Sequence, residues 1–237
     1  MAFSLITSRY AGHDHRMLKV RNMPELLASV RLVNEPVRSR DPRFIREPAN
    51  LCMLVTHWKG AIPAGGLICQ EKIDGIRALW IDGRLVTREG NEIGGADHIA
   101  AELRAIETAF GRPMFLDGEF QVDGTLKATM RHFLQCGRYG PAGRLFLFDA
   151  LPMTEWRSDT SGEALWARLD ALTKVMAPIS TEHVSVLTFH HCATAAEVTA
   201  LAESVWARNG EGLVAKAPAS LYRRHRSTEW RKVKQQE

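Results

Sequence analysis

Lys72 lies among residues that can turn it into a nucleophile, in the stretch QEKIDGIR over 70–77. A lysine attacks only after its ammonium has lost a proton, and neighbouring cations or partial desolvation promote that loss. Arg77 can supply a neighbouring charge, Gly75 allows close approach to a phosphate, and Asp74 can orient the amine or bind a water on a metal. Taken alone, the stretch is equally consistent with a surface hairpin.

Five further clusters of charged or aromatic residues follow this stretch along the chain. They are TREG (87–90), FLDGEF (115–120), LFLFDAL (145–151), EGLVAK (211–216) and WRKVK (230–234). This set, in this order, resembles the covalent nucleotidyltransferase superfamily and specifically the ATP-dependent DNA ligases. The resemblance runs from about Gln70 to Lys234, which is most of the chain, and the agreement of all the clusters makes it specific.

The pattern of predicted elements is regular from Leu67 onward. Alternating and apolar runs predict strands, and Asp82-Gly83 predicts a hairpin turn, so that Lys72 lies in a loop between strands. The expected strands are 67–70, 78–81, 84–87, 114–121, 144–148, 184–189 and 212–217. The expected helices are 24–33, one behind an Asp97 N-cap that ends at Gly111, 161–176 and 195–209.

Strands and hairpins with peripheral helices indicate an α+β layout. The resemblance narrows this layout to an adenylation (nucleotidyltransferase) domain. In that fold, two mainly antiparallel β-sheets flanked by helices enclose an ATP cleft.

Aromatic and basic residues in the clusters are candidates for holding the nucleotide. Phe146 and Phe148 alternate on a strand and share one face, which the residues alone would assign to the core. The resemblance instead makes Phe148 the platform on which the purine stacks. It also implies that Arg88 contacts the ribose and phosphate, and that Arg77 holds the ribose or the nucleic-acid strand.

The remaining candidates serve the triphosphate. Glu119 and Glu211 stand at strand ends beside glycines, where acids are usually solvated edge charges. The resemblance makes Glu119 a ribose or metal contact and Glu211 a metal ligand, and carboxylates suit Mg²⁺, with Mn²⁺ as an alternative. Lys232 and Lys234 alternate on a strand and so point the same way, towards the α-phosphate, and Lys216 completes the set. A soluble strand edge is the plainer alternative.

The residue two places before Lys72 departs from the family pattern. Many ATP-dependent ligases carry a glutamate there that reads the adenine amino group, whereas this chain has Gln70, with Glu71 beside it. An amide can still hydrogen-bond adenine. We therefore expect ATP rather than GTP or NAD, with both residues close to the nucleotide.

The resemblance implies an enzyme that works in three steps. Lys72 attacks the α-phosphorus of ATP and forms lysyl-AMP, the AMP moves to a 5′-phosphate, and the adjacent 3′-hydroxyl then seals the backbone. Nicked duplex DNA is the expected substrate, as in DNA repair or replication. An RNA ligase, an mRNA-capping guanylyltransferase and a nucleic-acid-binding protein with a vestigial nucleotide pocket remain as alternatives.

Basic residues are concentrated at the start of the chain. Residues 1–50 hold nine Arg and Lys against five Asp and Glu, an excess that equals the net charge of +4 of the whole chain. With four prolines and one predicted helix, this stretch is interpreted as a basic N-terminal arm that grips nucleic-acid phosphates, or else as a surface strap. The stretch RRHR (223–226) is expected to add a phosphate-binding patch.

Residues 51–237 are long and apolar enough to form one catalytic domain. The chain ends three residues after Lys234, so we expect no OB-fold of the kind that usually follows in ligases. No stretch is apolar enough for a membrane span or a signal peptide, which favours a cytoplasmic protein, and we expect a monomer. The four widely spaced cysteines do not indicate a zinc site.

Overall fold

The computed structural model describes residues 50–135, 140–159 and 161–235. All of these residues belong to one compact unit. The predicted basic arm, with its helix over 24–33, lies outside the described residues except for Asn50. Within the described ranges, no helix is long and apolar enough to cross a membrane.

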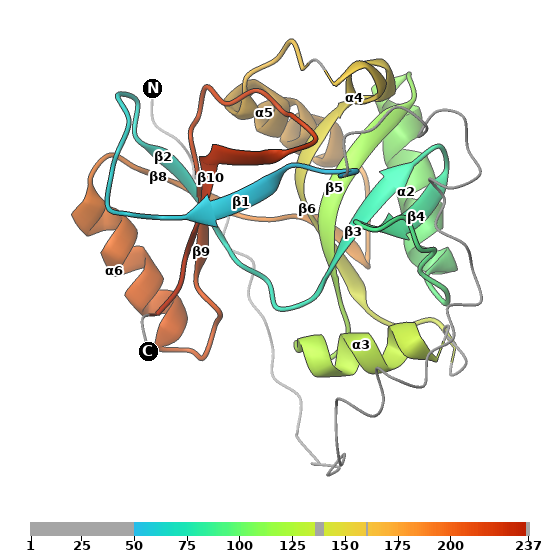
Figure 1. The fold of residues 1–237 in the computed structure, drawn as a ribbon. Helices are drawn as coiled ribbons and strands as arrows, with labels where there is room; N and C mark the ends of the chain where they lie inside the picture. The colour runs from blue at the N-terminus through green and yellow to red at the C-terminus, as the bar shows by residue number, and fades with distance from the viewer. Residues whose placement is uncertain (1–49, 136–139, 160, 236–237) are drawn as a thin grey trace. The chain divides into compact units, whose positions relative to one another are not determined.

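Two five-stranded sheets form the framework (Figure 1). Sheet A has the order β1 (Leu54–His57), β10 (Arg226–Val233), β9 (Leu213–Lys216), β2 (Leu67–Glu71) and β8 (Phe189–Cys192). Sheet B has the order β4 (Arg84–Thr87), β3 (Ile76–Ile81), β5 (Met114–Gln121), β6 (Arg144–Pro152) and β7 (Val184–Val186). Each sheet holds one parallel pair, β1–β10 or β6–β7, and its other pairs are antiparallel. The predicted α+β class with two mainly antiparallel sheets is confirmed.

The chain crosses between the sheets twice within the described residues. Sheet B comes from one stretch, β3 to β7, which is inserted between β2 and β8 of sheet A. The crossings are residues 72–75, which include Lys72, and residues 187–188. The predicted single strand over 184–189 is therefore wrong. Its two halves pair in different sheets, because the chain leaves sheet B at Leu187.

Helices flank both sheets (Figure 1). The helix α2 (Asp97–Phe110) packs on sheet B, α5 (Leu165–Met176) packs on β6, and α6 (Ala195–Trp206) packs on β8 and β9. As predicted, α2 ends at Gly111, which adopts the left-handed conformation that glycine tolerates best. The predicted Asp97 N-cap is wrong. Ala96 occupies the cap position, and Asp97 begins the helix, where its charge complements the positive helix end.

The sequence patterns miss three elements, namely β1, α3 (Leu126–Leu134) and α4 (Met153–Ser158). Of these, α3 matters most for the site. It begins with an N-cap, because the Thr125 hydroxyl accepts a hydrogen bond from the backbone N–H of Ala128.

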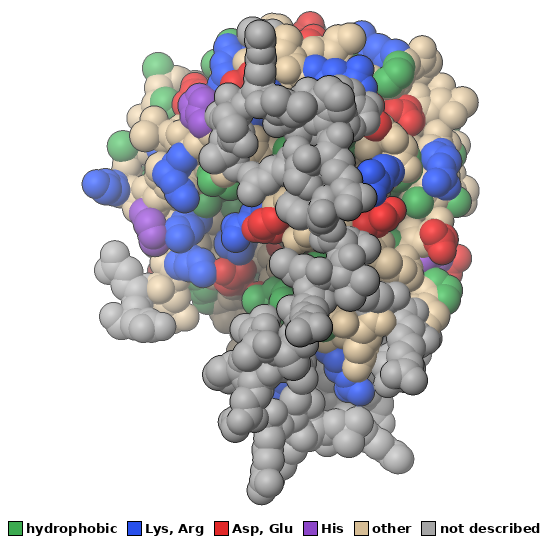
Figure 2. Space-filling model, turned by 45° about the vertical axis from the view of Figure 1, so that its right-hand side comes forward, with side chains coloured by type: hydrophobic (Ala, Val, Ile, Leu, Met, Phe, Trp, Pro, Cys, Tyr) green, Lys and Arg blue, Asp and Glu red, His purple; other side chains and the backbone are tan. Residues whose placement is uncertain are grey.

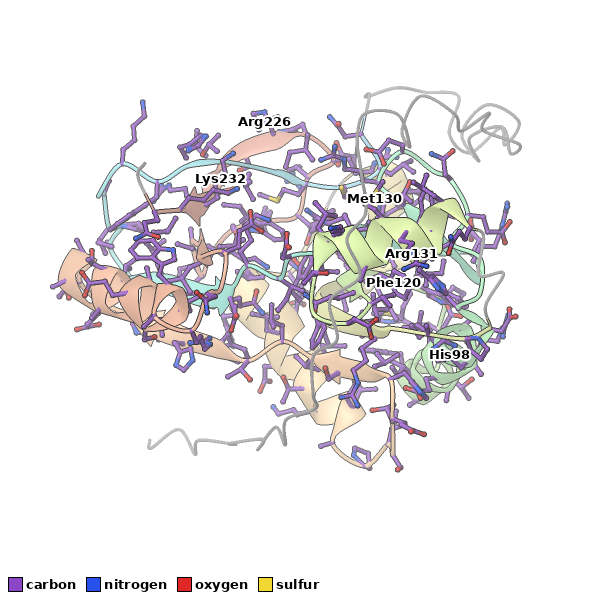
Figure 3. All side chains as sticks on the ribbon, turned by 90° about the horizontal axis from the view of Figure 1, so that it is seen from below. His98, Phe120, Met130, Arg131, Arg226 and Lys232 are labelled. Atoms are coloured by element: carbon purple, nitrogen blue, oxygen red, sulfur yellow. The ribbon has the colours of Figure 1, made fainter. Side chains whose placement is uncertain are left out.

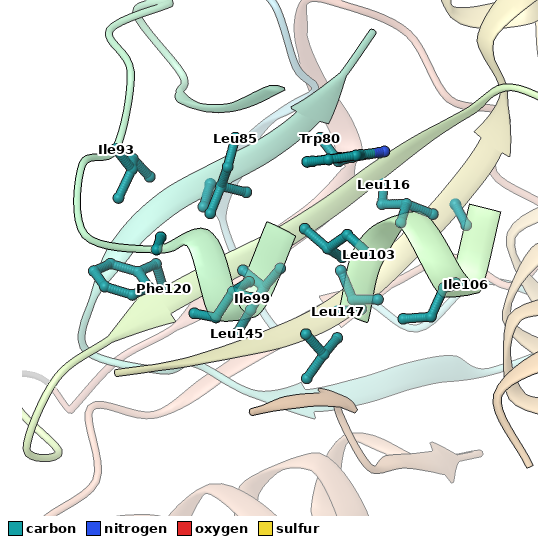
Figure 4. Close-up of a cluster of buried hydrophobic side chains, with 14 of the residues drawn as sticks. Trp80, Leu85, Ile93, Ile99, Leu103, Ile106, Leu116, Phe120, Leu145 and Leu147 are labelled. Carbon is teal, nitrogen blue, oxygen red and sulfur yellow. The ribbon is translucent and has the colours of Figure 1, made fainter. Parts of the chain in front are cut away.

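The largest core lies between α2 and sheet B (Figure 4). Ile99, Leu103 and Ile106 repeat at helical spacing, are fully buried, and pack in one cluster with Trp80 and Leu116. Burying a side chain of this size contributes about 1.5–3 kcal/mol. This packing makes sheet B a firm wall for the site on its other side.

Candidate active site

A cleft of about 680 Å³ opens between the two sheets, beside the first crossing. All of the predicted site residues except Asp74 line it: Gln70, Glu71, Lys72, Arg77, Arg88, Glu119, Phe148, Glu211, Lys216, Lys232 and Lys234. The fold thus brings stretches from both sheets to one place. The role of each side chain remains a prediction.

The Lys72 ammonium lies against Glu211. Its Nζ donates to Glu211 Oε2 over 2.6 Å, and the Lys72 backbone N–H donates to the Gly212 carbonyl over 2.9 Å. The Lys234 Nζ lies 2.6 Å from the other carboxylate oxygen, Oε1. Burial disfavours the charged form of Glu211, but the hydrogen bonds from Lys234 and Lys72 outweigh burial and lower its pKa. Glu211 is therefore a carboxylate that holds two ammonium groups together.

Alternate residues of β10 and its continuation line one wall of the cleft. These are Arg226, Trp230, Lys232 and Lys234, which share one face because they are two or four positions apart. Figure 3 labels Arg226 and Lys232 on this wall and Met130 on α3. The wall carries three cationic side chains and one aromatic ring.

A second wall is apolar and comes from α3. Leu126, Met130 and Phe133 line the cleft at the i, i+4, i+7 spacing of one helix face. The sequence analysis missed this wall, although the Thr125 N-cap followed by that spacing is the signal that could have found it. Asn91 is also missed. It lines the cleft, and its Oδ1 has no hydrogen-bond partner among the described residues.

Lys216 lies almost fully buried beside two aromatic rings. Its Nζ is 3.9 Å from the ring centroid of Trp230 and 4.5 Å from that of Phe148, and it donates to the Phe148 carbonyl over 3.2 Å. Burial lowers the pKa of Lys216 to about 7, against the negative charge of Asp149. Phe148 lines the cleft and Phe146 does not, which fits the choice of Phe148 as the base platform.

Arg77 is held by a buried carboxylate. Its Nε and Nη2 each donate to Asp117 over 2.6 Å, and the Tyr222 hydroxyl donates to the same carboxylate over 2.5 Å. Burial acts to lower the pKa of Arg77, but the charge of Asp117 raises it well above its ordinary value. The Arg77 Cζ lies over the Phe148 ring, 4.8 Å from its centroid. Arg88, in contrast, is exposed and pairs with its neighbour Glu89.

Asp74 contacts the start of α3. Its Oδ2 accepts a hydrogen bond from the Leu126 N–H over 3.0 Å, and it does not line the cleft. Glu71 does line the cleft, but its carboxylate pairs with Arg208.

One member of the predicted phosphate-binding patch is buried. Arg224 is only 7% exposed, because its guanidinium packs over the ring of Trp156. The prediction is therefore wrong for Arg224. Arg226 is exposed and lines the cleft.

Glu119 and Glu211 are the predicted ligands of a divalent cation in the cleft. Glu119 is half-buried, and burial raises its pKa to about 7 despite the positive charges of Arg77 and Lys72. The described residues hold no group of three or more His, Cys, Asp or Glu that could bind a metal. Glu119 and Glu211 nevertheless suit Mg²⁺, which commonly uses one or two carboxylates and completes its shell with water and substrate phosphates.

Gly212, next to Glu211, occupies a place that excludes a side chain. Its φ is 135°, and a Cβ there would lie 2.1 Å from the Val233 carbonyl oxygen. We expect Gly212→Ala to lower the free energy of unfolding by about 1–3 kcal/mol, as measured by urea denaturation. Gly162→Ala is the control, because a Cβ there meets nothing closer than 3.8 Å. Equal urea midpoints for the two variants would contradict this expectation.

Lys216 makes stability depend on pH. Its pKa is lowered from 10.5 to about 7 on folding, so between these values the unfolded chain binds the extra proton. Stability therefore rises as the pH increases through this window. Lys216→Met removes the group, so the free energy of unfolding of the wild type minus that of the variant should rise by roughly 1.4 kcal/mol per pH unit. Urea titrations between about pH 7.5 and 9.5 check this, and a constant difference would refute it.

Solved ligase structures share this fold. Pmar-Lig_PreS3 matches with a TM-score of 0.69 at 21% identity, over 78% of this chain and 46% of that one. The ATP-dependent DNA ligase from bacteriophage T7, solved with ATP, matches with a TM-score of 0.64 at 16% identity, over 77% and 68%. The ligase domain of M. tuberculosis LigD gives 0.54 at 23% identity, over 77% and 60%. The chain spans about half the length of the Pmar-Lig chains that it matches.

The family follows from the sequence match. No curated protein matches the chain. The family described as "ATP dependent DNA ligase domain" matches residues 51–234, which include every residue that lines the cleft. The resemblance carried by the sequence clusters is thereby confirmed, and the chain belongs to the ATP-dependent DNA ligase domain family.

Proposed function

We propose that the chain is an ATP-dependent polynucleotide ligase, which seals 5′-phosphate/3′-hydroxyl nicks in duplex DNA through a lysyl-AMP intermediate. The observation that carries this proposal is the position of Lys72, whose Nζ lies beside Glu211 in a cleft lined by further cations. Membership of the ligase family supports the reaction class.

In the first step, the Lys72 amine attacks the α-phosphorus of ATP. A phosphorus–nitrogen bond forms, the bond from the α-phosphorus to the bridging oxygen breaks, and pyrophosphate leaves. The amine must first lose a proton. The Glu211 carboxylate, which accepts a hydrogen bond from the Lys72 Nζ over 2.6 Å, is placed to take that proton.

Positive charge then stabilises the phosphates as the reaction proceeds. Glu119 and Glu211 would hold Mg²⁺, which neutralises charge on the triphosphate. Lys232 of β10 and Lys234 just after it add cations at the same cleft. In the later steps, AMP moves to the 5′-phosphate of the nick, and attack by the 3′-hydroxyl forms the phosphodiester bond and releases AMP.

Gln70 supports adenine as the base. Its Nε2 donates to the Leu187 carbonyl over 3.2 Å, which leaves its Oε1 buried in the cleft wall without a hydrogen-bond partner among the described residues. An oxygen fixed in this way only accepts hydrogen bonds. The 6-amino group of adenine can donate to it, whereas the 6-oxo group of guanine cannot. The proposal therefore names ATP rather than GTP.

Exposed cations support a nucleic-acid substrate. Arg88 and Arg226 are exposed at the cleft, and on the face drawn in Figure 2 Lys and Arg side chains are interspersed with Asp and Glu. Such cations bind phosphates by releasing counterions. The proposal includes the basic residues of 1–50, which lie outside the described residues, as a further phosphate grip. A role in DNA repair or replication, as a cytoplasmic monomer, belongs to the same proposal.

Lys72→Ala should abolish covalent attachment of AMP, because the phosphoramidate needs the ε-amine. The test is incubation with α-labelled ATP and Mg²⁺, followed by denaturing electrophoresis. Lys174→Ala is the control, because that lysine is 75% exposed on α5 and does not line the cleft. Undiminished label on the Lys72→Ala protein would show that Lys72 is not the nucleophile.

The same assay separates the alternative functions. Nicked DNA and nicked RNA, added in parallel, distinguish a DNA ligase from an RNA ligase. Labelled GTP tests a capping guanylyltransferase. A wild-type chain that takes no label from either nucleotide would be a binding protein with a vestigial pocket.

Gln70→Leu should reduce the preference for ATP over GTP. The variant keeps a similar volume but removes the acceptor, and a lost partner of this kind costs about 1–3 kcal/mol, or roughly 5- to 150-fold in the preference. The measurement is the ratio of kcat/KM for self-labelling with the two nucleotides. Because both nucleotides are tested on the same protein, a change in stability cancels from the ratio. An unchanged ratio would show that Gln70 does not read the base.

A further inference from the structure

Arg168 is a buried arginine outside every sequence cluster. It lies on α5, and only 2% of its side chain is exposed. Its guanidinium donates hydrogen bonds to Asp149 of sheet B, to Ser220 in the loop between two strands of sheet A, and to Ser161 and Glu163 just before α5. A buried ion pair often adds little net stability, because removing the charges from water offsets their attraction. The burial of Arg168 therefore calls for an explanation other than stability.

On one side, Arg168 binds the strand that carries the Phe148 platform. Its Nε and Nη2 donate to the two Asp149 oxygens over 2.7 and 2.8 Å. Asp149 directly follows Phe148 in β6, and it faces α5 while Phe148 faces the cleft. The bidentate pair therefore fixes the backbone beneath the platform, in sheet B.

On the other side, Arg168 binds the loop between β9 and β10 of sheet A. Its Nη1 donates to the Ser220 carbonyl over 3.1 Å. The Ser220 hydroxyl in turn accepts from the Trp230 Nε1 over 3.2 Å. This loop joins the strand of Lys216 to the strand of Trp230, so both residues beside the platform depend on it.

We propose that Arg168 is a positioning residue that sets the spacing between Phe148 and Trp230 and thereby the affinity of the cleft for ATP. This inference rests on the proposed function, because it takes ATP as the ligand. The planar guanidinium binds Asp149 and Ser220 at once. A lysine in its place keeps the charge but cannot make the fork of parallel hydrogen bonds.

The test compares Arg168→Lys with the wild type and with Arg157→Lys. Arg157 also pairs with an aspartate, Asp82, but Asp82 lies in the turn between β3 and β4, and neither residue lines the cleft. We expect Arg168→Lys to raise the KM for ATP in self-labelling by roughly 5- to 30-fold. The rate at saturating ATP should stay within about twofold, because Lys72 and Glu211 are untouched. Arg157→Lys should change neither value.

A second variant separates positioning from stability. Arg168→Met combined with Asp149→Leu replaces the buried ion pair by apolar side chains, which commonly preserves stability. We expect this protein to unfold at a urea concentration close to that of the wild type and still to bind ATP more weakly. Recovery of wild-type ATP affinity in the double variant would overturn the proposal. A fall in the saturated rate of Arg168→Lys with an unchanged KM would overturn it as well.

Calorimetric titration with ATP in the absence of Mg²⁺ keeps the two proposals distinguishable. A wild-type chain that binds ATP but takes no label would refute the ligase, while the comparison of ATP affinities would still decide the role of Arg168. Equal ATP affinities for the wild type and Arg168→Lys would refute that role alone.

Discussion

Two buried aspartates, in register on neighbouring strands, constrain the structure around the cleft. Asp117 of β5 and Asp149 of β6 are partners across the ladder, and neither side chain is exposed. Carboxylates directly opposite each other repel, and each of these two lies against its own arginine. Arg77 forms an ion pair with Asp117, and Arg168 forms one with Asp149. Arg77 comes from β3, which already pairs with β5 in the sheet, whereas Arg168 comes from α5, so the second ion pair ties that helix to the middle of sheet B.

The same ion pairs determine what the cleft presents to an anionic ligand. Arg77 lies over the Phe148 ring, and the charge of Asp149 acts on the buried amine of Lys216. At the other end of the lysine set, Glu211 holds Lys72 and Lys234. Most of these cationic side chains thus already form ion pairs with carboxylates. A nucleotide that enters would need to order few side chains, which reduces the entropic cost of binding.

The chemistry of the site could be predicted because it is concentrated in short stretches whose residue types are dictated by what they bind. Lys72, Phe148 and Glu211 are recognisable in this way, and they line one cleft. Arg168 is different. In sequence it is one more arginine on an amphipathic helix, and only its two distant partners, Asp149 and Ser220, distinguish it from a surface residue.

Other failures of the sequence analysis have the same cause, because the deciding partner lies far away in the chain. The apolar run over 184–189 continues past Leu187, yet its halves find partners on β6 and on β2. In the stretch RRHR, Arg224 and Arg226 look alike, but a tryptophan ring on α4 buries the former. The local sequence pattern predicts whether a segment forms a helix or a strand. The sheet that a strand joins and the burial of a side chain are decided by tertiary contacts.

The placement of the two crossings has a mechanical consequence. The chain passes between the sheets at residues 72–75 and again at 187–188, and the Gln70 amide ties the two passages together through the Leu187 carbonyl. Two crossings joined in this way would act as the pivot for any turn of one sheet against the other, and Lys72 lies on the first of them. If one sheet turned against the other, atoms far from the pivot would sweep the longest arcs and the attacking nitrogen the shortest. Any such turn would therefore displace the attacking nitrogen less than it displaces the walls of the cleft.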